Sequence, residues 1–372
     1  MAQAGLNMSR RIRRTPYTDR VEAHGVRGFS VVNHMLLPKA FQPDVEDDYF
    51  HLRSNVQIWD VAVQRQVQIT GQDAARLVQM MTPRDISAAV TGQCLYLPLI
   101  DQNAGMLNDP VLLKLGEDSF WLSIADSDIK LWAGGIAGAR GMDVRVFEPD
   151  VSPLAIQGPK SFDVVADLCG DWIRELRYFG FRDYDLDGIP VVVARSGWSK
   201  QGGFEFYLRD GSRGEELWNL VAEAGKPYGI GPGTPNYVER VESGLISYGA
   251  DTDDMSNPFE YGLGKFMDVD QEGDFAGKEA LRLIRDAGVT RRFMGLLIEG
   301  EPFATTNESP WQLSNSDGAY AGYASASAWS LRANSNIAVA MVSVEAIESG
   351  KGVVVHTEAG DLKAQVVELP II

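Results

Sequence analysis

The chain has 372 residues, of which 45% are apolar and 23% charged, the composition of a globular protein with two or three sub-domains. Asp and Glu number 51 against 34 Lys and Arg, and the formal net charge of −17 argues against nucleic acid or an anionic membrane as a partner. No run of 18 apolar residues is present, so we expect no membrane-spanning segment.

Cysteine and histidine usage argues against both a disulfide framework and a metal site. Cys94 and Cys169 follow no paired motif, and we predict that both are reduced core residues of a cytoplasmic protein. The four histidines are scattered without the short spacings of zinc ligands, so no bound metal is expected. The basic segment 10–14 lacks a following apolar stretch, which excludes a secretory signal and predicts a solvated arm.

Hydrophobic periodicity predicts helices and strands that are intermingled without regular alternation, and this favours an α+β fold. In chain order we expect a strand at 66–69, a helix at 73–81, strands at 111–114, 119–124 and 143–147, a helix at 160–168, strands at 191–194 and 203–208, a helix at 214–224, a helix with one polar side at 238–247, a helix at 278–287, and strands at 293–298, 337–344 and 352–356.

The helical pattern ends near Gly300. Short strands punctuated by glycine follow, and they predict a small C-terminal β-barrel or sandwich from about residue 290 to 372. We place the division between the two regions of the chain at 285/286.

The segment 195–205 is the most informative part of the sequence. An apolar run leads into a polar, glycine-rich turn, and an alternating segment follows, which predicts a hairpin with an irregular turn. The turn carries Trp198 and the returning strand carries Glu205. An aromatic face with a nearby carboxylate suits a flat heterocycle, because the ring stacks and the carboxylate accepts from its N–H edge.

Each residue of this region also has a structural interpretation. Glu205 fits an outward charge as well as a pocket acceptor, and Trp198 fits a half-buried hairpin aromatic. Tyr207 lies two residues beyond Glu205, so both point to the same face of the strand, where Tyr207 fits either cross-strand packing or ligand contact. Asp109 precedes a proline at the start of an apolar strand, a position typical of turn chemistry. Tyr96 is a weaker candidate.

The segment 195–205 resembles the folate-binding strand pair of the glycine-cleavage T-protein (aminomethyltransferase) superfamily, usually Arg-Thr-Gly-Tyr-Thr-Gly-Glu-Asp-Gly-Phe-Glu. A second signature of that superfamily matches 257–264 and 274–281, in the same order along the chain. Further segments resemble one branch of the superfamily, the tetrahydrofolate-dependent dimethylsulfoniopropionate demethylases of marine bacteria. This closer likeness extends from about residue 10 to 372 and includes 32–38, 56–61, 107–111, 123–128, 155–160 and 194–203.

The resemblance implies a ring of three lobes around a folate pocket. Residues 1–285 form two of the lobes, the first of them discontinuous in sequence, and 286–372 form a β-barrel. It implies tetrahydrofolate as methyl acceptor and a small onium compound as methyl donor. A homodimer is a further possibility from the sequence.

The resemblance also assigns residues. Asp109 matches the central catalytic aspartate. Trp198, Glu205, Tyr207 and Tyr96 are expected to bind folate, and Trp198, Tyr207 and Met35 the methyl donor. Two departures stand out: the usual preceding Asp is Asn108, and an Arg that contacts folate is replaced by Asn236. The tail of folate must therefore be held elsewhere or remain in solvent.

Two other functions stay open at this point. One is a T-protein-type aminomethyltransferase, or a folate-dependent demethylase of another onium donor such as a betaine. The other is a non-catalytic folate-binding protein that assists iron–sulfur assembly on the same fold. The Lys-Gly-Cys-Tyr-x-Gly-Gln-Glu signature of that group is absent, which argues against the second alternative.

Overall fold

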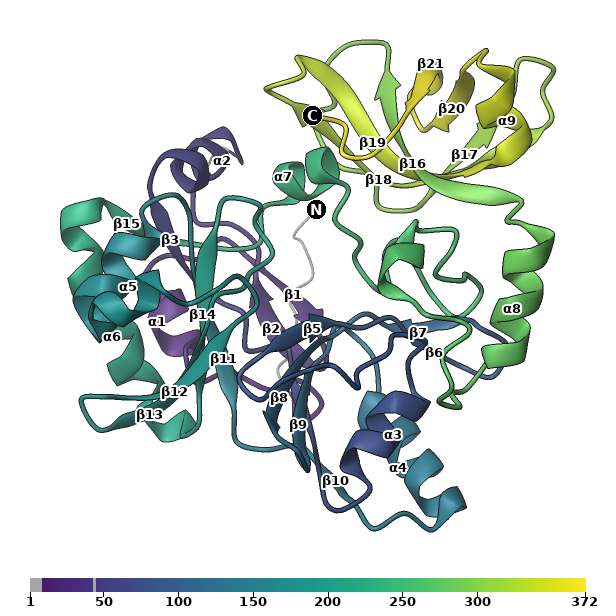
Figure 1. Cartoon of the computed structure of the whole chain (residues 1–372). Coiled ribbons are helices and arrows are strands. Elements are labelled where there is room, and N and C mark those ends of the chain that lie inside the picture. Colours follow the sequence, from purple (N-terminus) through teal and green to yellow (C-terminus); the bar gives the residue numbers. More distant parts are fainter. Residues whose placement is uncertain (1–8, 43–44) are drawn as a thin grey trace.

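The computed structural model describes residues 9–42 and 45–372. The first eight residues of the predicted 1–285 region therefore lie outside the described residues. A six-stranded sheet, a five-stranded sheet and a closed barrel form three lobes (Figure 1). The α+β fold with a C-terminal barrel is thus confirmed. In the part of the chain that is described, no helix is long and apolar enough to cross a bilayer.

The six-stranded sheet combines segments that are distant in the sequence. β3 (Val56–Asp60) pairs with β11 and with β15, so a strand near the N-terminus joins strands from 152–233. The remaining strands, in spatial order up to β3, are β12 (Phe181–Leu186), β13 (Ile189–Ala194), β14 (Gly203–Leu208) and β11 (Ser152–Gln157), and β15 (Ile230–Gly233) lies beyond β3.

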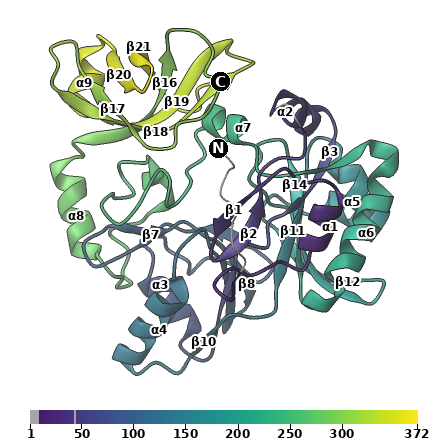
Figure 2. The ribbon, with the colours of Figure 1, turned by 180° about the vertical axis from the view of Figure 1, so that it is seen from behind.

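Three helices cover one face of this sheet, as both views show (Figures 1 and 2). They bury its apolar side chains. They are α1 (Thr18–Ala23), α5 (Ser161–Cys169) and α6 (Gly214–Gly225). Short 3-10 turns accompany them at Asp171–Arg174, Gly211–Arg213 and Lys226–Tyr228. Cys169 is free and buried in this core, and Cys94 is free and buried in another, as predicted.

The strands of the five-stranded sheet come from the segment between β3 and β11 in the sequence. Its strands, in spatial order, are β10 (Arg145–Phe147), β4 (Gln66–Thr70), β9 (Ser119–Ser123), β8 (Val111–Gly116) and β5 (Cys94–Tyr96). Its apolar face packs against α3 (Ala74–Met80) and α4 (Ile129–Arg140). Beside it, β6 (Leu99–Ile100) and β7 (Met106–Asn108) form a short pair.

An N-terminal hairpin contacts this region through the Asn33 side chain, which donates to the carbonyl oxygens of Val63 and Ala125. β1 (Phe29–Val32) and β2 (Met35–Pro38) are joined by Asn33 and His34, and both joining residues have positive φ angles, of 51° and 62°. That backbone conformation matches the twist of a two-residue hairpin, and Asn adopts it at low cost. The predicted solvated arm before the hairpin is partly wrong, because Arg13 pairs with Glu148.

The barrel closes in the order β16 (Arg291–Ile298), β19 (Ser335–Ser343), β18 (Tyr320–Ser330), β17 (Trp311–Ser314), β20 (Val353–Thr357) and β21 (Gly360–Val367). The expectation of no helix after Gly300 is wrong, since α9 (Val344–Ser349) follows β19. The Ser343 side chain accepts from the Ala346 N–H, and this cap starts the helix where a strand was predicted to continue.

The predicted helices at 73–81, 160–168, 214–224 and 278–287 are confirmed as α3, α5, α6 and α8 (Lys278–Ala287). The polar helix is shorter than predicted: α7 (Tyr237–Ser243) ends where Gly244 adopts a left-handed conformation. A 3-10 turn at Leu263–Phe266 follows. Among the described residues, four helices were missed: α1, α9 and two others. α2 (Val45–Ser54) is polar, and α4 contains three glycines that tertiary packing tolerates.

Candidate active site

Glu205 lies in the middle of the six-stranded sheet, on β14. Its cross-strand neighbours are Ala155 on β11 and Ala194 on β13. Paired residues of neighbouring strands point to the same face, so two methyl groups flank the carboxylate and leave space beside it. The predicted hairpin of 191–194 and 203–208 is confirmed by this pairing.

The carboxylate of Glu205 is almost fully buried and is hydrogen-bonded at one oxygen. The Ser196 hydroxyl donates to its Oε2 at 2.5 Å, and the Tyr207 hydroxyl donates to the same atom at 3.2 Å. Burial raises the pKa of Glu205, and the two hydrogen bonds oppose that rise. Its Oε1 remains available to accept from the N–H edge of a ligand.

Tyr207 is completely buried between the two sheets. Its ring lies 6.2 Å from that of Trp121 on β9, and it belongs to a cluster that also contains Val192 and Cys94. The observed contacts are therefore packing and the bond to Glu205. Contact of Tyr207 with folate or donor stays a prediction.

The loop that carries Trp198 wraps around the side chain of Gln157. The Gln157 amide donates to the carbonyl oxygens of Ser196 and Phe204, each at 3.2 Å, and its Oε1 accepts from the Ser199 hydroxyl at 2.7 Å. A Cβ at Gly197, where φ is 148°, would lie 2.2 Å from the Gln157 amide, so only glycine fits there. Trp198 itself is partly exposed.

Asp109 lies at the other end of the site, between β7 and β8. The hydroxyl of Tyr96, on β5, donates to its Oδ2 at 2.9 Å. Burial raises the pKa of Asp109 to about 7, the Tyr96 bond lowers it, and the charge of Asp251 adds to the rise. Burial, together with the charge of Asp109, raises the pKa of Tyr96 well above its usual range. Both residues are partly exposed.

Asn108 has a structural role in place of the usual second carboxylate. Its Oδ1 accepts from the N–H groups of Asp109 and Ala125, each at 3.0 Å, and its amide donates to Ser127 at 2.8 Å. Asn33 of the hairpin donates to the carbonyl oxygen of the same Ala125. Met35, two residues after Asn33, begins β2 and is buried. Its contact with a methyl donor stays a prediction.

Strand β5 connects the two ends of the site. Cys94 and Tyr96 are two residues apart and lie on one face of the strand, roughly 7 Å from each other along it. The charge of Glu205 contributes to the raised pKa of Cys94, after burial, and Tyr96 bonds to Asp109. Glu205 thus acts on Cys94 of β5, and Asp109 is bonded to Tyr96 of the same strand.

Tyr178 is a further candidate for the site, and the sequence interpretation did not name it. It is 66% exposed, stacks on Phe179 with ring centroids 4.5 Å apart, and its pKa is raised by burial and then by the charge of Glu205. An exposed aromatic ring of this kind is able to stack on a flat ligand. A Tyr-Phe pair in a loop carries no pattern that marks it in the sequence.

The polar helix α7 makes ion pairs with other segments of the chain. Arg240 binds Asp251 at 2.5 Å, and Glu242 lies 3.5 Å from Arg332. Asn236 uses its side chain as the cap of α7, accepting from the Glu239 N–H at 3.0 Å.

Hollows elsewhere do not involve these residues. One of about 450 Å³ lies along α6, and another of about 330 Å³ lies between α3, α4 and residues 274–276. None of the predicted site residues lines either of them. Among residues 9–42 and 45–372, no group of three His, Cys, Asp or Glu side chains is arranged to hold a metal ion.

Comparison with known proteins identifies the family. Residues 17–271 match the GCVT N-terminal domain, and residues 291–372 match the glycine cleavage T-protein C-terminal barrel domain. The aminomethyltransferase T of the glycine cleavage system from Bartonella henselae has the same fold, with a TM-score of 0.86, 21% identity, and coverage of 97% of this chain and 98% of that chain. The chain belongs to the glycine cleavage T-protein family.

Two relatives differ in how much of the chain they match. The dimethylsulfoniopropionate demethylase DmdA of Ruegeria pomeroyi is 44% identical over 357 residues, which are 96% of either chain. An aminomethyltransferase of Clostridium botulinum is 30% identical over 276 residues, 72% of this chain and 74% of that one. The likeness to the demethylase is thus both higher and longer.

Proposed function

We propose that this protein is a tetrahydrofolate-dependent methyltransferase that demethylates dimethylsulfoniopropionate. The products are 5-methyltetrahydrofolate and methylmercaptopropionate. The near full-length likeness to a demethylase of this substrate, at 44% identity, is the observation that carries the proposal. The site agrees with it, since it offers one buried carboxylate for a pterin edge and one partly exposed tryptophan for a cation.

The reaction asks for placement more than for acid–base catalysis. The bond from sulfur to one methyl carbon breaks, its electron pair stays on sulfur as a neutral thioether, and the methyl group becomes bonded to N5 of the reduced pterin. The N5 proton then passes to solvent. Holding the two reacting atoms in line within a site of low water content supplies several kcal/mol of the barrier reduction.

The roles of the residues follow from their positions. Glu205 accepts from the pterin through its free Oε1, and Tyr207 with Ser196 holds the other oxygen. Asp109 orients the reacting pair and stabilises positive charge near N5. Trp198 forms a wall for the methyl donor.

Incubation with tetrahydrofolate and single candidate donors tests the function. We expect 5-methyltetrahydrofolate and methylmercaptopropionate with the sulfonium donor, and much slower transfer from a betaine. Transfer from a quaternary ammonium donor at equal or higher kcat/KM would replace the proposal by its alternative, a demethylase of another onium compound. Aminomethyl transfer from a lipoyl donor would instead replace the proposal by a T-protein-type aminomethyltransferase.

Trp198→Leu should weaken binding of the sulfonium donor by about 1–2 kcal/mol, roughly a tenfold rise in Kd. Leucine keeps apolar bulk but lacks the ring quadrupole that attracts a cation. The control ligand is a neutral isostere with carbon in place of sulfur, whose affinity should be the same for both proteins. Equal losses for the charged and neutral ligands would show that Trp198 does not recognise the cation.

Lys39 is the group that we propose for the anionic tail of folate. Pro38 accepts from the Thr234 hydroxyl at 2.6 Å, which places Lys39 beside the start of α7, where the usual Arg is missing. Part of the Lys39 side chain is exposed. Desolvation of the rest, and then the charge of Arg240, lower the pKa of Lys39.

Lys39→Gln should raise the KM for tetrahydrofolate about three- to tenfold, the range of an exposed to partly desolvated ion pair. Added salt should reduce the difference between the proteins, because it screens the charge. A reduced pterin without the glutamate tail serves as control and should react equally well with both. An effect of the same size on that pterin would contradict the assignment.

A cytoplasmic location and a homodimer are also part of the proposal. The two free, buried thiols support a reducing compartment, and tetrahydrofolate is a reduced cosubstrate.

A further inference from the structure

The position of Trp198 depends on the loop around it. Among the described residues, the indole forms no hydrogen bond and no ring contact with another side chain. On one side the loop is held by Gln157, through Ser196 and Ser199. On the other side it is held by the Gln201 side chain, whose amide donates to Glu239 at 2.8 Å.

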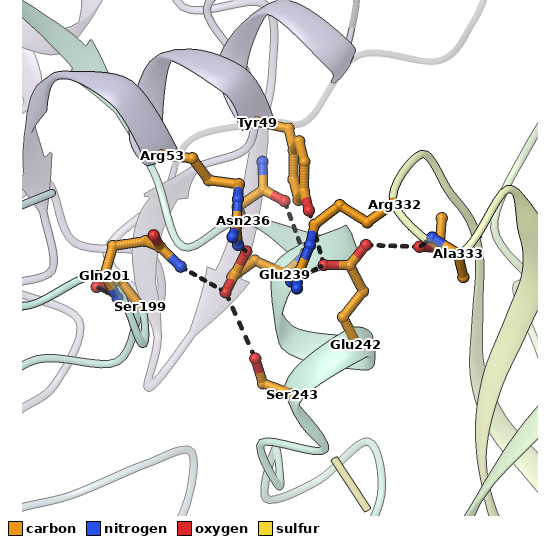
Figure 3. Close-up of polar contacts among 11 residues, drawn as sticks. Tyr49, Arg53, Ser199, Gln201, Asn236, Glu239, Glu242, Ser243, Arg332 and Ala333 are labelled. Atoms are coloured by element: carbon orange, nitrogen blue, oxygen red, sulfur yellow. Dashed lines mark hydrogen bonds and ion pairs between the residues drawn. The ribbon is translucent and has the colours of Figure 1, made fainter. Parts of the chain in front are cut away.

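Glu239 is a buried carboxylate on α7 with partners from three segments (Figure 3). Its Oε2 accepts from Arg53 of α2 at 2.7 Å. Its Oε1 accepts from Gln201, and the Ser243 hydroxyl lies 3.5 Å away on the same oxygen. A buried carboxylate is costly unless it is paired and hydrogen-bonded, and Gln201 supplies one of its hydrogen bonds beside the ion pair with Arg53.

The same helix contacts the barrel and α2 one turn later. Glu242 accepts from the Tyr49 hydroxyl at 2.8 Å (Figure 3). It also accepts from the Ser330 hydroxyl, on β18, at 2.6 Å. Because α7 is fixed by both carboxylates, Glu239 is a rigid anchor for the loop. A bond from a rigid helix restricts a loop more than a bond from another loop.

The contact with Glu239 also explains one departure from the usual superfamily segment, which has Glu where this chain has Gln201. A carboxylate there would face the Glu239 carboxylate at hydrogen-bond distance, and like charges at that separation repel strongly when partly buried. Gln201 and Glu239 are therefore matched as donor and acceptor.

We propose that Gln201 and Glu239 are a positioning pair that fixes the loop of Trp198 and thereby sets the affinity for the methyl donor. Neither residue is a catalytic residue, because each acts through the loop. The inference rests on the proposed function for the identity of the donor, but the anchoring of the loop is independent of it.

Two single variants and their combination test the pair. Gln201→Glu should repel Glu239, speed amide hydrogen exchange in 196–203, and raise donor KM up to about the tenfold expected from losing Trp198, with kcat changed less than about twofold. Glu239→Gln should have a similar effect. The Q201E/E239Q double variant exchanges the two groups and should restore both readouts, since one carboxylate again faces one amide.

Further variants separate positioning from general stability. Ser243→Ala removes a neighbour of the same carboxylate outside the loop and should leave exchange in 196–203 and donor KM unchanged. Gln201→Met removes the hydrogen-bond donor without adding charge, so it should also raise amide exchange in 196–203 and the KM for the donor. It replaces Gln201→Glu in the test if that variant does not fold. Failure of the double variant to restore exchange, or normal exchange in Gln201→Met, would overturn the proposal. If the wild type accepts no onium donor, the exchange results still decide the pair, while the proposed function alone fails.

Discussion

Asp109→Asn should lower kcat by roughly 10²-fold, because it removes the carboxylate that we propose to orient and stabilise the reacting pair, while keeping the size of the side chain. Folate and donor affinities should change little. Steady-state kinetics at saturating substrates measure the effect, and thermal unfolding shows whether the variant is folded. Loss of stability with normal turnover in the folded fraction would assign Asp109 to turn chemistry.

The role of Asp109 also predicts how kcat changes with pH. Burial raises the pKa of Asp109 to about 7, so its charged form grows as the pH rises through 7 and turnover should rise with it. Asp109→Asn should lose this limb of the profile. The Tyr96 hydroxyl stabilises the carboxylate, and Tyr96→Phe should therefore raise the pKa of Asp109 and move the limb to higher pH.

The free energy of unfolding should fall with rising pH, which is the opposite of the trend in turnover. The protonated Asp109 is favoured in the folded state, so its contribution to stability is present below the unfolded pKa and is lost as the pH rises through about 7. Asp109→Asn should remove this loss and be the more stable protein at high pH. Asp60 has a pKa raised to about 7 by burial as well, so the comparison with Asp109→Asn is needed to assign the effect.

Glu205→Gln should weaken folate binding by about 1.5–3 kcal/mol, the worth of a charge-assisted hydrogen bond, while donor affinity stays the same. The amide keeps the shape of the side chain, but it has one acceptor oxygen where the carboxylate has two. Titration with tetrahydrofolate in the absence of donor measures the change. Unchanged affinity in a folded variant would remove Glu205 from the site.

Ser196→Ala is the matched control for Glu205→Gln. It removes the donor at 2.5 Å from Oε2 but leaves the carboxylate and its free Oε1 in place. Its effect on folate affinity should therefore be smaller. Because that hydrogen bond lowers the pKa of Glu205, the variant should also lose folate affinity at a higher pH than the wild type as the solution is acidified.

The sequence determined the fold class, four of the helices and the hairpin of 191–194 and 203–208, because these depend on local periodicity and turn chemistry. It also marked Trp198, Glu205 and Asp109, since short motifs with fixed spacing survive in a single sequence. The barrel near the C-terminus followed from the disappearance of helical periodicity.

Tertiary structure decided what each marked residue contacts. The sequence places Tyr207 on the face of Glu205, yet only the packing of two sheets buries its ring against Trp121. The same holds for Glu239 and Gln201, which are 38 residues apart and form no motif. Their contact, the exposed ring of Tyr178 and the raised pKa of Asp109 all arise from segments distant in sequence, and no local pattern records such distances or the desolvation that they cause.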